Sequence, residues 1–268
     1  MLTGFIEWKK IQNREKVDDL IYKLQYEPVE AIKDTEQTLC TGFNLSLEEQ
    51  DRATWILQCD QVRHWVSVRQ PQILLVNSNE TEHTRVSSAS LFSAILITAM
   101  ERYGNAIILN WFCGLRTDCG PLEVLKSFVG QLLSKTDLDL SWMKDVWFSA
   151  FNPNHPNQLL KLFCRLVKQQ MENCPFPVIC IVDGLTFYED RDRFEDLCDL
   201  MRELTTLVDD GLADQHIIKI LATSPTRSSY GDKRSRLLPQ EVLDVPEYVD
   251  GGNRGISDRD MKMVADLL

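Results

Sequence analysis

Short, almost wholly apolar runs recur along the chain after residue 70. Four of them predict strands that are buried on both faces, because strands of a parallel sheet read as continuous hydrophobic runs. A fifth, shorter run could add one more strand. The five runs are 72–76, 106–109, 178–182, 217–222 and 242–245.

The stretches between these runs place apolar residues at helical spacing. Ser46 and Glu49 have the S-x-x-E form of a capping box, which predicts a helix start, and this helix should end before Pro71. Gly120-Pro121 predicts another start. Further helices are expected over 88–102, from 154–156 onward and around 194–208. Strands that alternate with helices predict an α/β fold: a parallel sheet flanked by helices, with 178–182 in its interior.

The pattern also suggests how the chain is divided. Residues 1–45 are interpreted as a helical N-terminal extension, since Leu20 and Leu24 share a helical face. The α/β domain is expected over 46–256. A last helix, capped by Ser257-Asp258, is expected over 257–268.

Composition narrows the class of partner. The 268 residues carry a net charge of -11, which disfavours nucleic acid and anionic membranes, because both need a basic face. The eight cysteines include no CxxC pair and are expected to be reduced thiols of an intracellular protein. No signal-peptide pattern and no apolar run of membrane-spanning length occurs. We therefore expect protein partners, and a location in the cytoplasm or nucleus.

The run 178–182 leads directly into Asp183-Gly184. A carboxylate that ends a buried strand lies at the carboxyl edge of a parallel sheet, where such sheets bind ligands. In a nucleotide hydrolase this aspartate holds magnesium, and a glycine-rich loop upstream holds the phosphates. The structural alternative is an aspartate that only accepts hydrogen bonds from backbone amides. The next strand ends in Thr223-Ser224, which adds two candidate hydroxyls.

A series of short motifs spans residues 50–252. They are Trp65-Val66, Pro71, Leu74-Leu75-Val76-Asn77, Phe112-Cys113-Gly114-Leu115, Ile181-Val182-Asp183-Gly184-Leu185-Thr186-Phe187-Tyr188-Glu189, Leu221-Ala222-Thr223-Ser224-Pro225 and Val245-Pro246-Glu247-Tyr248-Val249-Asp250-Gly251. Their order resembles the NACHT-like branch of the STAND class of P-loop NTPases. It is more similar still to a group of uncharacterised fungal proteins with a degenerate NACHT-like domain. The resemblance implies a P-loop-NTPase-like sheet with Asp183 at the Walker B position and Thr223-Ser224 at a sensor position.

The loop after the first strand departs from that family. A Walker A loop, G-x-x-x-x-G-K-[ST], needs glycines so that amides can wrap phosphate, and a lysine for its charge. This loop has neither, while Glu80 and Glu82 would repel phosphate. Arg85 is its only fixed cation, and Ser87 or Ser88 could mimic the magnesium-binding hydroxyl. The alternative is an ordinary connector whose serines cap the next helix.

The motif around Asp183 also departs from the pattern of that family. Asp183 is followed by glycine instead of the second acid that often activates water, and Glu189 and Asp190 come later, in an expected loop. Pro225 stands where NACHT-like proteins often have arginine, although Arg227 could substitute.

Other features suggest surfaces or core. An aromatic patch is interpreted as core or interface, an acidic segment over 186–214 as a solvated face or a docking surface for a basic partner, and a small basic loop as solvent-exposed. The four histidines have no zinc-ligand spacing. The patch is Trp142, Trp147, Phe148 and Phe151, the basic loop holds Arg227, Lys233, Arg234 and Arg236, and the histidines are His64, His83, His155 and His216.

These departures favour a P-loop-like fold that has lost nucleotide chemistry and serves as an interaction or regulatory module. We expect no catalytic residue, no cofactor and no metal, with Asp183, Thr223 and Ser224 as vestigial candidates. The chain ends soon after the predicted core, and we expect no helical and winged-helix domains of the STAND switches. The alternative function is a STAND-type switch that still binds ATP or GTP weakly through an altered loop. A third possibility is a shortened relic of a longer family member.

Overall fold

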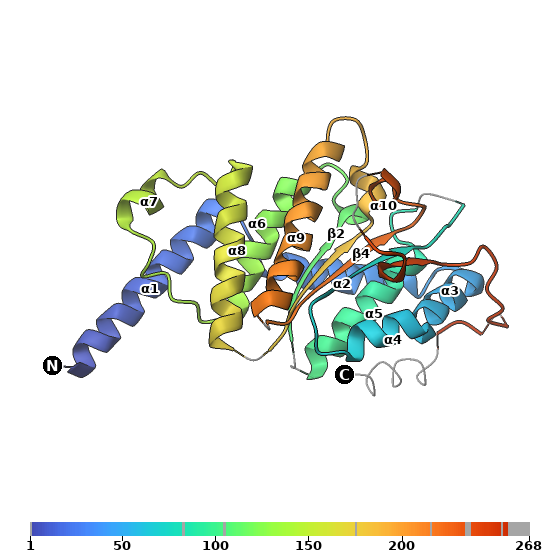
Figure 1. Cartoon of the computed structure of the whole chain (residues 1–268), viewed down its shortest axis with the longest axis horizontal. Helices are drawn as coiled ribbons and strands as arrows, with labels where there is room; N and C mark the ends of the chain where they lie inside the picture. The colour runs from blue at the N-terminus through green and yellow to red at the C-terminus, as the bar shows by residue number, and fades with distance from the viewer. Residues whose placement is uncertain are drawn as a thin grey trace.

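The computed structural model describes residues 2–81, 84–103, 106–174, 176–214, 216–233, 237–252 and 254–256 (Figure 1). The predicted helix over 257–268 lies outside these residues, as do Glu82, His83, Arg234 and Arg236.

Five parallel strands form one sheet in the order β2-β3-β4-β1-β5. The prediction of a parallel sheet with 178–182 in its interior is confirmed, because β3 lies between β2 and β4. The strands are β1 (Gln72–Asn77), β2 (Ile107–Phe112), β3 (Val178–Asp183), β4 (Ile218–Ser224) and β5 (Val242–Asp244).

Strand β2 continues beyond the predicted end at residue 109, through a buried Asn110. On the open edge of the sheet, the side chain of Gln131 takes the place of a neighbouring strand. Its Oε1 accepts from the Asn110 amide at 3.0 Å, and its Nε2 donates to the Asn110 carbonyl at 2.8 Å. The Asn110 side chain is satisfied too, because its Nδ2 donates to the Thr35 hydroxyl at 3.1 Å and to the Ala31 carbonyl at 3.4 Å. A polar residue is therefore compatible with this buried strand.

Helices cover both faces of the sheet, and alternate strand residues point into two separate apolar cores. Leu75, Leu109 and Cys180 pack against the layer of α6, α8 and α9, whereas Leu74 and Ile181 pack against that of α3, α4 and α5. The predicted α/β fold class, a parallel sheet flanked by helices, is confirmed. The helices are α3 (Leu47–Gln58), α4 (Asp60–Ser67), α5 (Ser88–Tyr103), α6 (Pro121–Lys135), α8 (Pro156–Asn173) and α9 (Phe194–Asp214).

The N-terminal extension is helical, as predicted, and consists of α1 (Leu2–Leu24) and α2 (Pro28–Gly42). Leu20 and Leu24 of α1 belong to the core beneath α6. Asp34 of α2 accepts two hydrogen bonds from the Arg116 guanidinium, at 3.1 and 3.2 Å. Glu30 adds a second ion pair to Arg116 at 3.4 Å. The Asn110 side chain of β2 also donates to the Thr35 hydroxyl at 3.1 Å, so apolar burial, an arginine and a buried asparagine join the extension to the α/β domain. The division at residue 45 stays a prediction.

The capping box at Ser46 and Glu49 is present and starts α3. The single helix predicted from there to residue 69 is wrong, because Cys59 adopts an extended conformation (ψ 135°) that separates α3 from α4. The aspartate that follows opens α4, where a negative charge is favourable next to the free amides.

Within the described residues no helix combines the length and the apolar character that crossing a bilayer requires. Five short helical elements complete the described part of the chain. They are η1 (Cys113–Leu115), α7 (Asp145–Ala150), η2 (Leu185–Tyr188), α10 (Ser229–Lys233) and η3 (Pro239–Glu241).

Candidate functional site

Asp183 lies at the carboxyl end of β3 with only 1% of its surface exposed. Its carboxylate accepts hydrogen bonds from the Thr223 hydroxyl at the end of β4 and from the Ser90 hydroxyl of α5, the latter at 2.7 Å. The expectation that backbone amides hold this aspartate is wrong. Two hydroxyls hold it instead, one from the neighbouring strand and one from the helix that follows β1.

Burial dominates the electrostatics of Asp183. Loss of hydration raises its pKa most, the hydroxyls of Thr223 and Ser90 lower it, and the nearby Glu80 carboxylate raises it, which together give a pKa of about 6. A carboxyl group with this pKa is largely protonated in mildly acidic solution. It is therefore a poorer cation ligand than an ionised strand-end aspartate.

Glu80 occupies the start of α5. Its Oε1 accepts from the Ser88 amide at 2.7 Å, from the Ser88 hydroxyl at 2.5 Å and from the Ser78 hydroxyl at 3.2 Å. Free amides at the beginning of a helix form an anion-binding site, and the helix dipole favours negative charge there. In this protein the anion is the chain's own carboxylate. Burial raises the pKa of Glu80, whereas the bonds from Ser88 and Ser78 lower it.

The path of the loop between β1 and α5 explains how Glu80 reaches that position. Asn79 adopts a positive φ of 52°, and the Glu80 amide donates to the Pro225 carbonyl at 2.8 Å. Further along, the carbonyl of Arg85 packs against Gly114 so closely that a Cβ at Gly114 would overlap with it. The loop is therefore pinned at both ends to segments that follow other strands.

The serines of the loop have separate roles. Ser87 caps α5, since its hydroxyl accepts from the Ser90 amide at 3.1 Å, which agrees with the expected capping role. Ser88 binds Glu80, as described above. The Arg85 side chain is exposed and forms no ion pair with the described part of the chain. The only fixed cation of the loop is thus not directed into the site.

The two residues at the sensor position, Thr223 and Ser224, form hydrogen bonds with different neighbours. Thr223 contacts Asp183, whereas Ser224 donates to the Thr186 hydroxyl at 3.2 Å. Gly184, at a φ of 82°, turns the chain after Asp183, and its amide donates to the Thr223 carbonyl at 3.0 Å. The two neighbouring strand ends are therefore joined by side-chain and backbone bonds.

The more distant candidates lie elsewhere. Glu189 does not approach Asp183; it caps α10, accepting from the Ser228 hydroxyl and from the Ser229 amide at 2.8 Å. Asp190 binds Arg193, whose guanidinium lowers the pKa of that carboxyl. Arg227 is exposed. Glu189 and Asp190 therefore supply no water-activating acid next to Asp183.

Sequence reasoning missed Arg52, a buried residue of α3. Its guanidinium donates to the carbonyls of Pro246 at 2.8 Å and Glu247 at 2.9 Å, and also to the carbonyl of Ser78. It holds together α3, the loop after β1 and the segment after β5. In sequence, Arg52 is one charged residue in an amphipathic helix, so no local pattern could have indicated this role.

The described residues contain no cluster of three or more histidine, cysteine, aspartate or glutamate side chains that could hold a metal ion. The site as a whole offers one buried and one half-buried carboxylate, several hydroxyls and no lysine or arginine among the partners of Asp183 and Glu80. The hydroxyls can donate only a few hydrogen bonds to a phosphate. The carboxylates are negatively charged, as a phosphate is, and therefore repel it.

No family model matches the chain, and no curated protein matches it. Among solved structures, one of the Aeropyrum pernix ORC1 protein in complex with DNA is similar in shape, with a TM-score of 0.43 and 12% sequence identity. The match covers 76% of this chain and 46% of that chain, so this chain spans less than half of the length of that protein. The fold class given above rests on this chain's own strands and helices.

Proposed function

We propose that this protein is a non-catalytic, P-loop-NTPase-like module that binds protein partners and does not use nucleotides. The observation that carries the proposal is the Glu80 carboxylate at the start of α5, the position that a phosphate would need. The resemblance to degenerate NACHT-like proteins supports the same function, and fungal origin belongs to that resemblance. A cytoplasmic or nuclear location stays a prediction.

The energetics favour this proposal over a nucleotide switch. A phosphate would have to displace three hydrogen bonds to Glu80 and approach a carboxylate of its own sign. Each charge-assisted contact that the missing lysine and glycine-supported amides would have made is worth about 1.5–3 kcal/mol. Losing a lysine and two or three amides removes on the order of 5–10 kcal/mol, and a micromolar site has only about 8 kcal/mol in total.

Calorimetric titration with ATP and with GTP, each in magnesium, tests the proposal. We expect no dissociation constant below about 100 μM and no turnover. A tighter constant, or hydrolysis abolished by Asp183→Asn, would refute the proposal and support the alternative, a STAND-type switch with an altered phosphate loop. Asp183→Asn is the matched control because it keeps the size of the side chain and removes its charge.

A further inference from the structure

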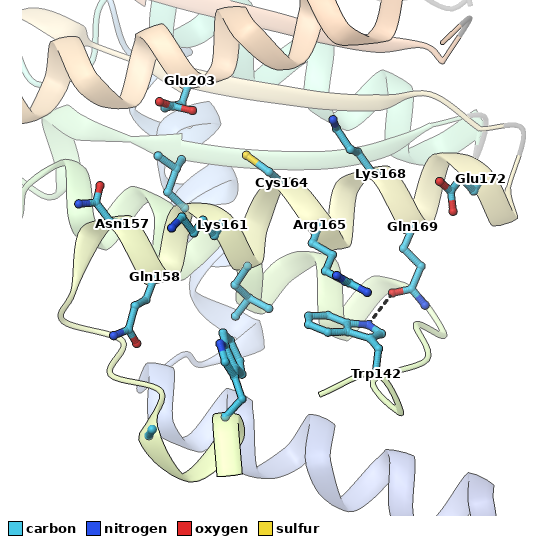
Figure 2. Close-up of a pocket in the computed structure, with 14 residues that line it drawn as sticks. Trp142, Asn157, Gln158, Lys161, Cys164, Arg165, Lys168, Gln169, Glu172 and Glu203 are labelled. Atoms are coloured by element: carbon cyan, nitrogen blue, oxygen red, sulfur yellow. Dashed lines mark hydrogen bonds between the residues drawn. The ribbon is translucent and has the colours of Figure 1, made fainter. Parts of the chain in front are cut away.

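A groove of about 940 Å³ lies along α8, on the side that faces the segment before it (Figure 2). We call it the arm groove, after residues 139–151, the arm that forms its second wall. Figure 2 shows Arg165 and Gln169 directed from α8 toward Trp142 of the arm. The groove is remote from Asp183 and Glu80, which do not line it.

The aromatic wall of the groove is held in place. Trp142 donates its indole N–H to Gln169 Oε1 at 3.2 Å, and the Arg165 guanidinium lies 4.0 Å from the centre of the Trp142 ring. Trp147 lies 6.2 Å from Trp142 and stacks on Phe151 at 5.2 Å. Phe151 is buried, so the row of rings is anchored at one end in the core.

The outer part of the arm is exposed although it is apolar. None of the residues of α7 is buried, and Val146 and Trp147 are 84% and 39% exposed. Large apolar side chains that gather on one exposed segment are typical of surfaces that bind another molecule. In the predicted aromatic patch, Phe151 therefore belongs to the core, whereas Trp147 is exposed.

The charges of the opposite wall indicate which molecule fits. Lys161, Arg165 and Lys168 follow one another along α8, and Lys168 pairs with Asp210 at 2.7 Å. Lys161 and Arg165 form no ion pair with any described residue. The exposed indole of Trp147 thus lies in the same groove as two cations that have no ion pair with a described residue.

We propose that the arm groove binds an acidic peptide segment of a protein partner, with an aromatic or leucine side chain between carboxylates. The apolar side chain packs on Trp147, and the carboxylates pair with Lys161 and Arg165. This proposal rests on the proposed function as an interaction module and adds the surface and the chemistry of the partner. Arginine and tryptophan are also the side chains that most often dominate protein interfaces.

A nucleic acid fits the groove less well than a peptide. A polyanionic strand needs a continuous row of cations along its path. Here the two cations are followed by Glu172 and face Glu203 across α8, and the whole chain carries a charge of -11. One or two carboxylates of a short peptide can pair with Lys161 and Arg165 without approaching these acids.

The test is a selection of displayed random 12-residue peptides on the full chain, followed by titration of the enriched peptides. We expect enrichment of sequences that combine Asp or Glu with Trp, Phe or Leu. The double variant Lys161→Glu/Arg165→Glu should weaken their binding at least tenfold, and Trp147→Ala should weaken it by a similar factor. Lys33→Glu, a single charge reversal at an exposed position of α2, is the control and should change binding less than twofold.

Several results would overturn the proposal. They are no enrichment, enriched peptides without acidic residues, equal weakening by Lys33→Glu, and tighter binding of a single-stranded oligonucleotide or an anionic vesicle through the same residues. Thermal unfolding of each variant separates lost binding from lost folding. The nucleotide titration is independent of this selection. Nucleotide binding would refute only the proposal that the protein does not use nucleotides. Failed peptide selection would refute only the proposal that the arm groove binds an acidic peptide.

Discussion

Asp183→Asn tests the electrostatic account of the site most directly. The pKa of Asp183 is about 6 in the folded protein, against about 3.9 for an unperturbed aspartate. Because the folded state binds the proton more tightly, the contribution of this residue to stability is fully present below the unfolded pKa. It decreases as the pH rises through the interval between the two values. At about 1.4 kcal/mol per pKa unit, the full decrease is about 3 kcal/mol.

Asparagine is neutral at every pH in this range, so the variant lacks this dependence. We expect the free energy of unfolding of Asp183→Asn, relative to the parent, to increase by about 2–3 kcal/mol between pH 4 and pH 7.5. The amide can still accept from Thr223 or Ser90, although one of its own N–H groups needs a new acceptor, which costs about 1 kcal/mol at all pH values. Titrations of carboxyl groups that do not interact with Asp183 cancel in the difference.

Urea unfolding at half-unit steps from pH 4 to pH 8 measures the effect. Asp192→Asn, at an exposed position, is the control and should change stability by no more than about 0.5 kcal/mol throughout. A difference between parent and Asp183→Asn that stays constant with pH would refute the burial argument, and so would a variant that becomes less stable toward neutral pH.

Four further predictions concern the same region and its supports. Asp183→Ala should lower stability by about 1–3 kcal/mol at pH 4 in urea unfolding, because two buried hydroxyls lose their acceptor, and a variant as stable as the parent would contradict this. Magnesium at millimolar concentration should leave the melting temperature of the parent unchanged, and a rise that Asp183→Ala abolishes would identify a metal site. Glu80→Ala should cost about 1–3 kcal/mol because the Ser88 amide and hydroxyl lose their partner, and its affinity for ATP should improve by no more than about tenfold, since no lysine replaces the carboxylate. Arg116→Met should lower the opening free energy of α2 by about 1–2 kcal/mol and so raise its amide hydrogen exchange. Unchanged exchange would mean that apolar packing and the Asn110 hydrogen bond hold α2 without the arginine.

The strands could be predicted because burial on both faces leaves a plain apolar run. The errors have local causes. Asn110 concealed the second half of β2, because its polar side chain interrupts the apolar run and is buried through hydrogen bonds to Thr35 and Ala31, which are distant in sequence. The break at Cys59 interrupts an apolar stripe that continues on both sides, so periodicity alone could not reveal it.

The site could be predicted only where it depends on strand order. Asp183 and Thr223 end neighbouring parallel strands, and the structure places their side chains in contact. The position of Glu80 depends instead on a left-handed Asn79 and on a backbone bond to Pro225. The sequence indicated only that this loop repels phosphate, not that the loop supplies an anion of its own.

The order of strands in the sheet has a consequence for synthesis of the protein. Strand β1 pairs only with β4 and β5, so Gln72 meets Lys219 and Leu75 meets Val242. As the chain leaves the ribosome from its N-terminus, β1 therefore waits for its partners until residues beyond 217 have been made, although β2 and β3 can already pair. Until then an apolar strand has both edges open, the state that invites pairing with other chains. We expect the nascent protein to depend on chaperones that cover this strand.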